Sequence, residues 1–105
     1  MALPFVTAIV VAAGNSTRMG RNKLLLSVGG EPLIVKTVAA FVNAESVRDI
    51  VVVTSSDDVK KAITEKQFSK NIMFADGGNC RQESVRNGFY AVSPNTEIVC
   101  VHDGA

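Results

Sequence analysis

Hydrophobic residues in this chain follow two alternating patterns. The first consists of short runs, rich in β-branched residues, in which apolar and polar positions do not alternate. Such continuous runs are typical of strands that are buried on both faces of a sheet. They predict strands at Val6–Val11, Ile50–Thr54, Ile72–Ala75 and Ile98–His102.

Between the predicted strands, apolar residues recur at the three- and four-residue spacing of an amphipathic helix. Pro32 suits the first turn of the first helix, and Ser55 or Ser56 suits the cap of the second. The third helix is expected to end before Pro94. The apolar positions that define the three helices are Ile34, Val38, Phe41 and Val42, then Val59, Ala62 and Ile63, then Val85, Phe89 and Val92.

Strands that alternate with helices predict an α/β fold with a Rossmann-like, mostly parallel sheet flanked by helices. In such sheets, ligands bind beyond the carboxyl ends of the strands. Three segments rich in glycine or polar residues each follow a predicted strand, at 12–23, 76–79 and 102–104. Packing alone gives no reason for this placement, so we expect a ligand site at that edge of the sheet.

The composition is that of one small globular domain. Of the 105 residues, 47% are hydrophobic and 20% are charged, which argues against disorder. The net charge of +1 and the lack of tryptophan give no reason to expect a nucleic-acid partner. The apolar N-terminal segment is too short to span a membrane. Cys80 and Cys100 lack metal-binding spacing and are expected to be free thiols in a reducing cytoplasm, and His102 alone cannot build a histidine-based metal site.

The segment after the first predicted strand carries Arg18, Arg21 and Lys23 with no carboxylate among them. Its spacing fits neither a P-loop nor a dinucleotide fingerprint, because Met19 and Ser16 stand where glycines are required. A glycine turn with fixed positive charge is nevertheless how proteins bind polyphosphates. The segment therefore predicts a nucleotide or a similar phosphorylated ligand, with an ordinary strand-to-loop junction and solvated cations as the alternative.

The other two segments carry candidate ligand-binding residues of their own. Gly77 and Gly78 precede Arg81 and Ser84, which share a face of the first turn of the third predicted helix. This group suits a base or a sugar hydroxyl, and a plain turn with a helix cap explains it equally well. Asp103 follows the last predicted strand, where a carboxylate is well placed to hold Mg²⁺ with substrate phosphates; an Asx-turn residue is the alternative.

In order along the chain, three motifs resemble those of the nucleotidyltransferases. They are A-A-G-x-x-x-R-M-G with N-K (residues 12–23), G-G-x-x-R-x-x-S-V-x-x-G (77–88) and V-H-D-G-A (101–105). The first is shared by many sugar and cofactor nucleotidyltransferases. The second and third together resemble most closely the 2-C-methyl-D-erythritol 4-phosphate cytidylyltransferase family, of the non-mevalonate isoprenoid pathway, and its pentitol-phosphate relatives. The resemblance implies that residues 1–105 are the N-terminal nucleotide-binding part of a single nucleotidyltransferase domain, similar in fold to the nucleotide-diphospho-sugar transferases and incomplete at the C-terminus.

The resemblance also implies a reaction and roles for individual residues. The implied enzyme transfers CMP from CTP to 2-C-methyl-D-erythritol 4-phosphate, a sugar-alcohol phosphate, and releases pyrophosphate with Mg²⁺ as cofactor. It would be a cytoplasmic homodimer at full length, with no nucleic-acid or membrane partner. Arg18 and Lys23 would stabilise charge on the phosphates, and Asp103 would bind Mg²⁺. Backbone contacts to CTP are implied for Ala12, Ala13 and Gly14, and contacts to the cytosine and ribose for Gly78, Asn79, Arg81 and Ser84.

This chain departs from the family pattern in three respects. Asn22 and Leu24 stand where the family usually has Pro and Gln, a pattern also seen in molybdenum-cofactor nucleotidyltransferases, and Asn79 stands where Asp is common. The chain ends at Ala105, whereas the family's enzymes are about twice as long and carry their second metal carboxylate, substrate-phosphate residues and dimerising arm beyond that point. The chain alone is therefore expected to be inactive. The alternatives are a nucleotide-binding module without turnover, or a related transferase for ribitol 5-phosphate or a molybdenum cofactor precursor.

Overall fold

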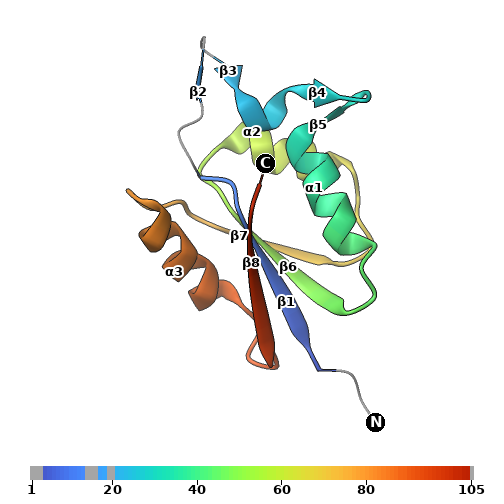
Figure 1. Cartoon of the computed structure of the whole chain (residues 1–105), viewed down its shortest axis with the longest axis vertical. Coiled ribbons are helices and arrows are strands. Elements are labelled where there is room, and N and C mark those ends of the chain that lie inside the picture. The colour runs from blue at the N-terminus through green and yellow to red at the C-terminus, as the bar shows by residue number, and fades with distance from the viewer. Residues whose placement is uncertain (1–3, 14–16, 19–20, 105) are drawn as a thin grey trace.

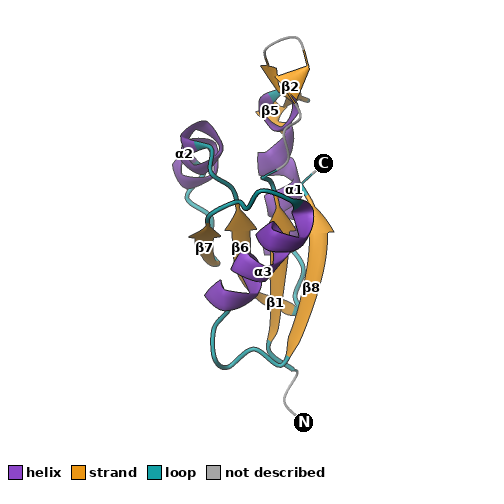
Figure 2. Cartoon of the chain, turned by 90° about the vertical axis from the view of Figure 1, so that its left-hand side faces the viewer, coloured by secondary structure: helices purple, strands orange, loops and turns teal. Residues whose placement is uncertain are grey.

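A parallel sheet forms the centre of the molecule. The computed structural model describes residues 4–13, 17–18 and 21–104, and for residues 17, 18 and 21–23 it gives the backbone alone. The sheet consists of β1 (Val6–Val11), β6 (Val47–Val53), β7 (Asn71–Ala75) and β8 (Ile98–Asp103), in the order β7-β6-β1-β8. Figure 2 shows these strands side by side. The predicted strands and the predicted α/β fold are confirmed.

Three helices cover the two faces of this sheet in the described part of the chain. They are α1 (Leu33–Val42), α2 (Asp57–Glu65) and α3 (Arg81–Ala91). Figure 1 shows α3 on one side of the sheet and α1 on the other. Of the two caps expected for the second helix, Ser56 is the one used, because its Oγ accepts the Val59 N–H at 3.3 Å. None of the described helices is both long and apolar enough to cross a membrane.

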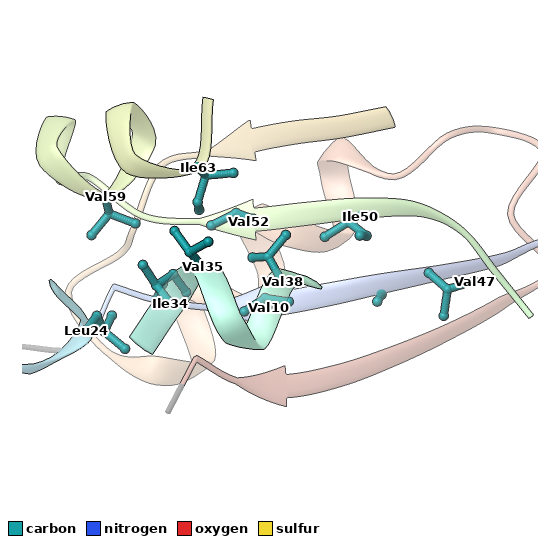
Figure 3. Packing of buried hydrophobic residues seen from close by; sticks show 12 residues of the cluster. Val10, Leu24, Ile34, Val35, Val38, Val47, Ile50, Val52, Val59 and Ile63 are labelled. Carbon is teal, nitrogen blue, oxygen red and sulfur yellow. The ribbon is translucent and has the colours of Figure 1, made fainter. Parts of the chain in front are cut away.

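Each face of the sheet has its own hydrophobic core, which explains why the apolar runs are continuous. Ala8 and Val10 of β1 pack with α1 and α2, whereas Ile9 and Val11 pack toward α3. Figure 3 shows the larger core, in which side chains from α1 and α2 meet those of β1 and β6. Burial on both faces is what a parallel sheet between helices requires.

The helix α3 lies unusually close to the sheet. Its buried positions are Ser84 and Gly88, and a Cβ at Gly88 would lie 2.7 Å from Ile9 Cγ2 and 2.9 Å from Val53 Cγ2. Phe89, which the apolar spacing assigned to the helix pattern, is 47% exposed. Gly88 and Ser84 therefore make the closest approach of α3 to the sheet, and Val85 and Ala91 of the same helix pack against the core beside them.

Short elements that the apolar pattern did not predict follow β1. The strands β2 (Thr17–Arg18) and β3 (Arg21–Asn22) pair antiparallel, and the 3₁₀ helix η1 (Lys23–Leu25) follows them. A second pair, β4 (Ser27–Val28) and β5 (Glu31–Pro32), closes through Gly29 and Gly30 at φ +60° and +88°. These values lie in the left-handed region that favours glycine. The chain thus makes two small hairpins between the first strand and α1.

Candidate functional site

A pocket of about 770 Å³ opens at the carboxyl ends of the strands. Each strand of the sheet contributes residues at or just after its end: Ala12 and Ala13 for β1, Ser55 for β6, Gly77 and Gly78 for β7, and Asp103 and Gly104 for β8. Residues at the start of α3 (Asn79, Cys80, Arg81 and Ser84) and Leu24 of η1 also line the pocket. The three segments that the sequence singled out therefore meet at one site.

Ala12 and Ala13 form the part of the pocket that follows β1. The Ala12 N–H donates to Val53 O at 2.8 Å, and Ala12 is buried. Ala13 is so close to the turn after β7 that a Cβ at Gly77 would lie 2.5 Å from Ala13 Cβ. Glycine is therefore required at position 77 by the approach of these two loops, and this approach joins the first and second motifs.

The turn after β7 is held by side-chain oxygens rather than by a strand partner. Three consecutive backbone N–H groups donate to them: Gly77 to Ser55 Oγ (3.0 Å), Gly78 to Ser84 Oγ (2.9 Å) and Asn79 to Glu83 Oε1 (3.3 Å). Ser84 is only 2% exposed, so its hydroxyl supports the turn from inside the protein. The predicted contact of Ser84 with a nucleotide stays a prediction, and its support of Gly78 is the contact observed.

Arg81 and Asp103 bring the second and third motifs together. Arg81 Nε donates to Asp103 Oδ1 at 3.2 Å, with the two side chains 61% and 63% exposed. An ion pair this exposed contributes little to stability, typically about 0–1 kcal/mol. Its position matters more, because it joins the start of α3 to the end of β8 across the pocket wall.

Asp103 is the residue on which a Mg²⁺ site would rest. The described residues contain no group of three or more His, Cys, Asp or Glu side chains placed to hold a metal ion. Mg²⁺, however, commonly binds through one or two carboxylates together with substrate phosphates, and keeps several waters. One exposed carboxylate on the pocket wall fits an ion that arrives with a nucleotide, and does not fit a closed metal centre. Metal binding by Asp103 stays a prediction.

The predicted phosphate-binding residues lie on the β2–β3 hairpin and η1. Arg18 is in β2, where its backbone pairs with Arg21, and Lys23 begins η1 directly before the pocket-lining Leu24. The backbone thus brings Lys23 next to the pocket. The side chains of Arg18 and Lys23, and the whole of Gly14, lie outside the described residues.

Sequence reasoning missed four residues of this site. The sequence predicts Ser55 only as a helix cap, Leu24 only as a departure from a motif and Cys80 only as a free thiol, and it gives Glu83 no role. Ser55 follows a predicted strand just as the other three segments do, and that position was a usable signal. The role of Glu83 depends on a turn that folds back onto its helix, which spacing does not reveal.

Comparison with known proteins identifies relatives of this chain. The family model for 2-C-methyl-D-erythritol 4-phosphate cytidylyltransferase matches residues 6–105. The protein of that name from Caldanaerobacter subterraneus subsp. tengcongensis is 41% identical over 106 residues, which are 95% of this chain and 47% of the relative. The one from Geobacillus thermodenitrificans is 44% identical over 103 residues, or 93% of this chain and 45% of the relative. The chain thus spans somewhat less than half the length of these curated relatives.

Solved structures give the same grouping. The 4-diphosphocytidyl-2C-methyl-D-erythritol synthase from Anaerococcus prevotii superposes with a TM-score of 0.81 at 32% identity, covering 96% of this chain and 43% of that one. The structure of CMP:2-keto-3-deoxy-manno-octonic acid synthetase complexed with CTP has a TM-score of 0.71 at 19% identity, and covers 95% of this chain and 40% of that one. The second likeness shows a shared fold alone.

Proposed function

Since this chain belongs to the 2-C-methyl-D-erythritol 4-phosphate cytidylyltransferase family, we propose that it forms the nucleotide-binding part of an enzyme that transfers CMP from CTP to 2-C-methyl-D-erythritol 4-phosphate. In the proposed reaction, a phosphate oxygen of the acceptor attacks the α-phosphorus of CTP. A new P–O bond forms, the bond between the α-phosphorus and the bridging oxygen breaks, and pyrophosphate leaves.

One observation carries the proposal: three motif segments, far apart in the sequence, meet in one pocket at the carboxyl ends of the strands. The close approach of Ala13 to Gly77 and the ion pair between Arg81 and Asp103 tie these segments together. Ligands of parallel α/β sheets bind at this edge. The pocket volume of about 770 Å³ also lies in the range of small-molecule sites.

The proposed roles of the residues follow from the charge that phosphoryl transfer develops. Such transfer relies on positioning and on neutralising charge, with little covalent chemistry for the protein to do. Arg18 and Lys23 supply fixed positive charge to the phosphates, while Ala12 and Ala13 contact CTP through the backbone. The Ala12 N–H takes no part in this contact, because it donates to Val53 O. When Mg²⁺ is bound, held by Asp103 and phosphate oxygens, it supplies further positive charge.

The base and ribose are proposed to lie along the turn between β7 and α3. Gly78, Asn79, Arg81 and Ser84 all line this side of the pocket. Asn79 is exposed and carries an amide that can both donate and accept hydrogen bonds, as the polar edge of cytosine requires. Glycine is needed at position 78 because a Cβ there would lie 2.5 Å from Cβ and Cγ of Glu83.

A related transferase is the second candidate. Leu24, which stands where the family usually has Gln, lines the pocket and is only 5% exposed. A leucine side chain here cannot form the hydrogen bonds that the family's Gln can form near the phosphates. Ribitol 5-phosphate and a molybdenum cofactor precursor are the alternative acceptors.

Pyrophosphate release tests the proposal. The assay uses a protein that joins this chain to the remaining length of its relatives, with CTP and each acceptor in turn. We expect release with 2-C-methyl-D-erythritol 4-phosphate and markedly less with ribitol 5-phosphate. The opposite preference would support the second candidate, and release with neither would contradict both. The 105-residue chain by itself is expected to bind CTP weakly without turnover.

A further inference from the structure

Glu83 touches the pocket turn from behind, although neither its residue type nor its spacing marks it as a site residue. Its Oε1 accepts the Asn79 N–H at 3.3 Å. A Cβ placed on Gly78 would lie 2.5 Å from both Cβ and Cγ of Glu83, so the stem of this side chain packs directly against the glycine. Glu83 is itself half-buried.

This contact differs from the usual capping of a helix. A glutamate at the third position of a helix commonly reaches back to the backbone N–H of the N-cap residue. The N-cap of α3 is Cys80, whose side chain makes no capping hydrogen bond within the described part of the chain. Glu83 reaches one residue further, to Asn79, and so fixes the turn that lines the pocket rather than the helix end itself.

Glu83 and Ser84 act on neighbouring positions of the same turn. Ser84 holds the Gly78 N–H and Glu83 holds the Asn79 N–H, so two consecutive residues of α3 fix two consecutive residues of the turn. Gly88 packs against Ile9 and Val53 of the sheet and so fixes the position of α3. The turn is hydrogen-bonded to α3, so its position is fixed relative to the core as well. A carboxylate at a helix N-terminus is also favoured by the helix dipole.

We propose that Glu83 is a positioning residue, whose carboxylate oxygen fixes the Gly78–Asn79 turn and thereby sets both the affinity and the base preference of the nucleotide pocket. This rests on the proposed function, since it assumes that the pocket binds CTP. Glu83 itself need not touch the nucleotide; it acts through Asn79, which lines the pocket.

A matched pair of variants tests whether the oxygen of Glu83 that accepts the Asn79 N–H is what matters. Glu83→Gln and Glu83→Met both remove the charge and keep the length of the side chain, and only Gln keeps the acceptor. We expect Glu83→Met to weaken CTP binding about tenfold or more, the size of losing one hydrogen bond to a charged group, and to reduce the preference for CTP over ATP. Glu83→Gln should keep the CTP affinity within about threefold of the wild-type value, because the amide oxygen still accepts.

Glu97 offers a control at the opposite end of the sheet. Its Oε1 accepts the Phe5 N–H at 3.0 Å, which is the same chemistry far from the pocket. Glu97→Met is therefore expected to leave the CTP affinity and the base preference unchanged. A nucleotide effect as large as that of Glu83→Met would overturn the proposal, because both would then be general effects on folding.

Amide hydrogen exchange at Asn79 tests the hydrogen bond between Glu83 and the turn without any nucleotide. Exchange should be faster in Glu83→Met than in Glu83→Gln, since only Glu83→Gln keeps an acceptor for the Asn79 N–H. If the wild type binds CTP and the two variants bind it equally, the positioning role is wrong while the proposed function stands. If the wild type does not bind CTP, the proposed function fails, and the positioning role fails with it.

Discussion

β1 and β8 are paired along their whole length, yet their two ends are built differently. At the amino end, Phe5 exchanges hydrogen bonds with Glu97, and Thr7 Oγ1 lies 2.7 Å from Thr96 Oγ1. At the carboxyl end, the Gly104 N–H donates to Val11 O at 2.8 Å. There, Thr37 Oγ1 of α1 also donates to Gly104 O at 2.9 Å, and further contacts come from the turn after β7 and the start of α3.

Contacts at the amino end close the sheet, whereas contacts at the carboxyl end shape the pocket. Contacts at the amino end join the two strands directly. At the carboxyl end, Ala13 contacts Gly77 in the turn after β7, and Asp103 pairs with Arg81 at the start of α3. Changes at the amino end should therefore alter stability alone, while changes at the carboxyl end should alter nucleotide binding beyond any loss of stability.

Lys23→Ala is expected to give the largest effect. In a protein that includes the remaining length of the relatives, we expect kcat to fall about 10²-fold or more, as when one stabiliser of developing charge is lost. If Lys23 acts on the ligand and not on the fold, the free energy of unfolding should change by less than about 0.5 kcal/mol. Steady-state kinetics and urea unfolding measure the two quantities.

Lys61→Ala is the matched control, since Lys61 is an exposed lysine of α2 whose side chain is 76% exposed. It should lose neither activity nor stability. Normal turnover by the Lys23 variant, or equal losses in the two variants, would contradict the role of Lys23 at the phosphates.

Ser84→Ala and Thr96→Val compare the two ends of the sheet directly. Ser84→Ala leaves the Gly78 N–H without its partner, so discrimination of CTP from ATP should fall by roughly 1–3 kcal/mol. Thr96→Val removes the hydroxyl beside Thr7 and should cost about 1 kcal/mol of unfolding free energy without changing discrimination. Binding titrations with both nucleotides and urea unfolding measure these effects. If the two variants discriminate CTP from ATP equally well, the carboxyl end of the sheet has no special role in nucleotide binding.

Asp103→Asn tests the metal assignment. For the wild type, removing Mg²⁺ with a chelator should weaken CTP binding by about 1 kcal/mol, the size of one charge interaction in water. The variant should bind CTP equally with and without Mg²⁺. Calorimetric titration gives both affinities, and a variant that keeps the full Mg²⁺ dependence would place the metal on other residues.

The smallest effect is expected at an ion pair that lies at neither end of these strands. Lys66 Nζ lies 2.7 Å from Glu31 Oε2, and its hydrogen bond and charge hold the pKa of Glu31 below its usual range. A lowered pKa in the folded state contributes stability above the unfolded pKa, and this is lost as the pH falls through the folded pKa. Lys66→Ala should raise the pKa of Glu31 in an NMR titration and flatten this acid dependence slightly. An unmoved titration curve would contradict the pairing.

Much of the fold could be predicted because the central strands β1 and β6 are buried on both faces, whereas the edge strand β8 leaves Ile98 and Val101 49% and 38% exposed. Continuous apolar runs located each strand, but β6 begins at Val47, earlier than predicted. Arg48 and Asp49 interrupt the apolar run there, and the register with β1 shifts, so that Val47 pairs with Val6 and Asp49 with Thr7. The hairpin strands are only two residues each, too short to have a period. On α3, the pattern selected Phe89 and overlooked Gly88, because a scale of hydrophobicity does not register close packing by a small residue.

The residues of the site that belong to the three motifs could be predicted from the sequence. Strand ends in a parallel sheet share one edge, so the meeting of Ala13, Gly77 and Asp103 followed from their positions after strands. The supporting contacts did not follow. Ser55 and Glu83 serve the site by accepting backbone N–H groups of a turn, and those contacts exist only once the turn has folded back.

The central claim, that the pocket at the carboxyl ends of the strands binds CTP, is tested most directly by cysteine labelling. Cys80 is exposed and lines the pocket, whereas Cys100 lies half-buried in β8. The 105-residue chain is treated with iodoacetamide, and mass spectrometry follows the alkylation of each thiol. We predict that CTP with Mg²⁺ slows alkylation of Cys80 more than ATP does at the same concentration, and leaves Cys100 unchanged. A Cys80 rate that saturating CTP does not alter would contradict the account.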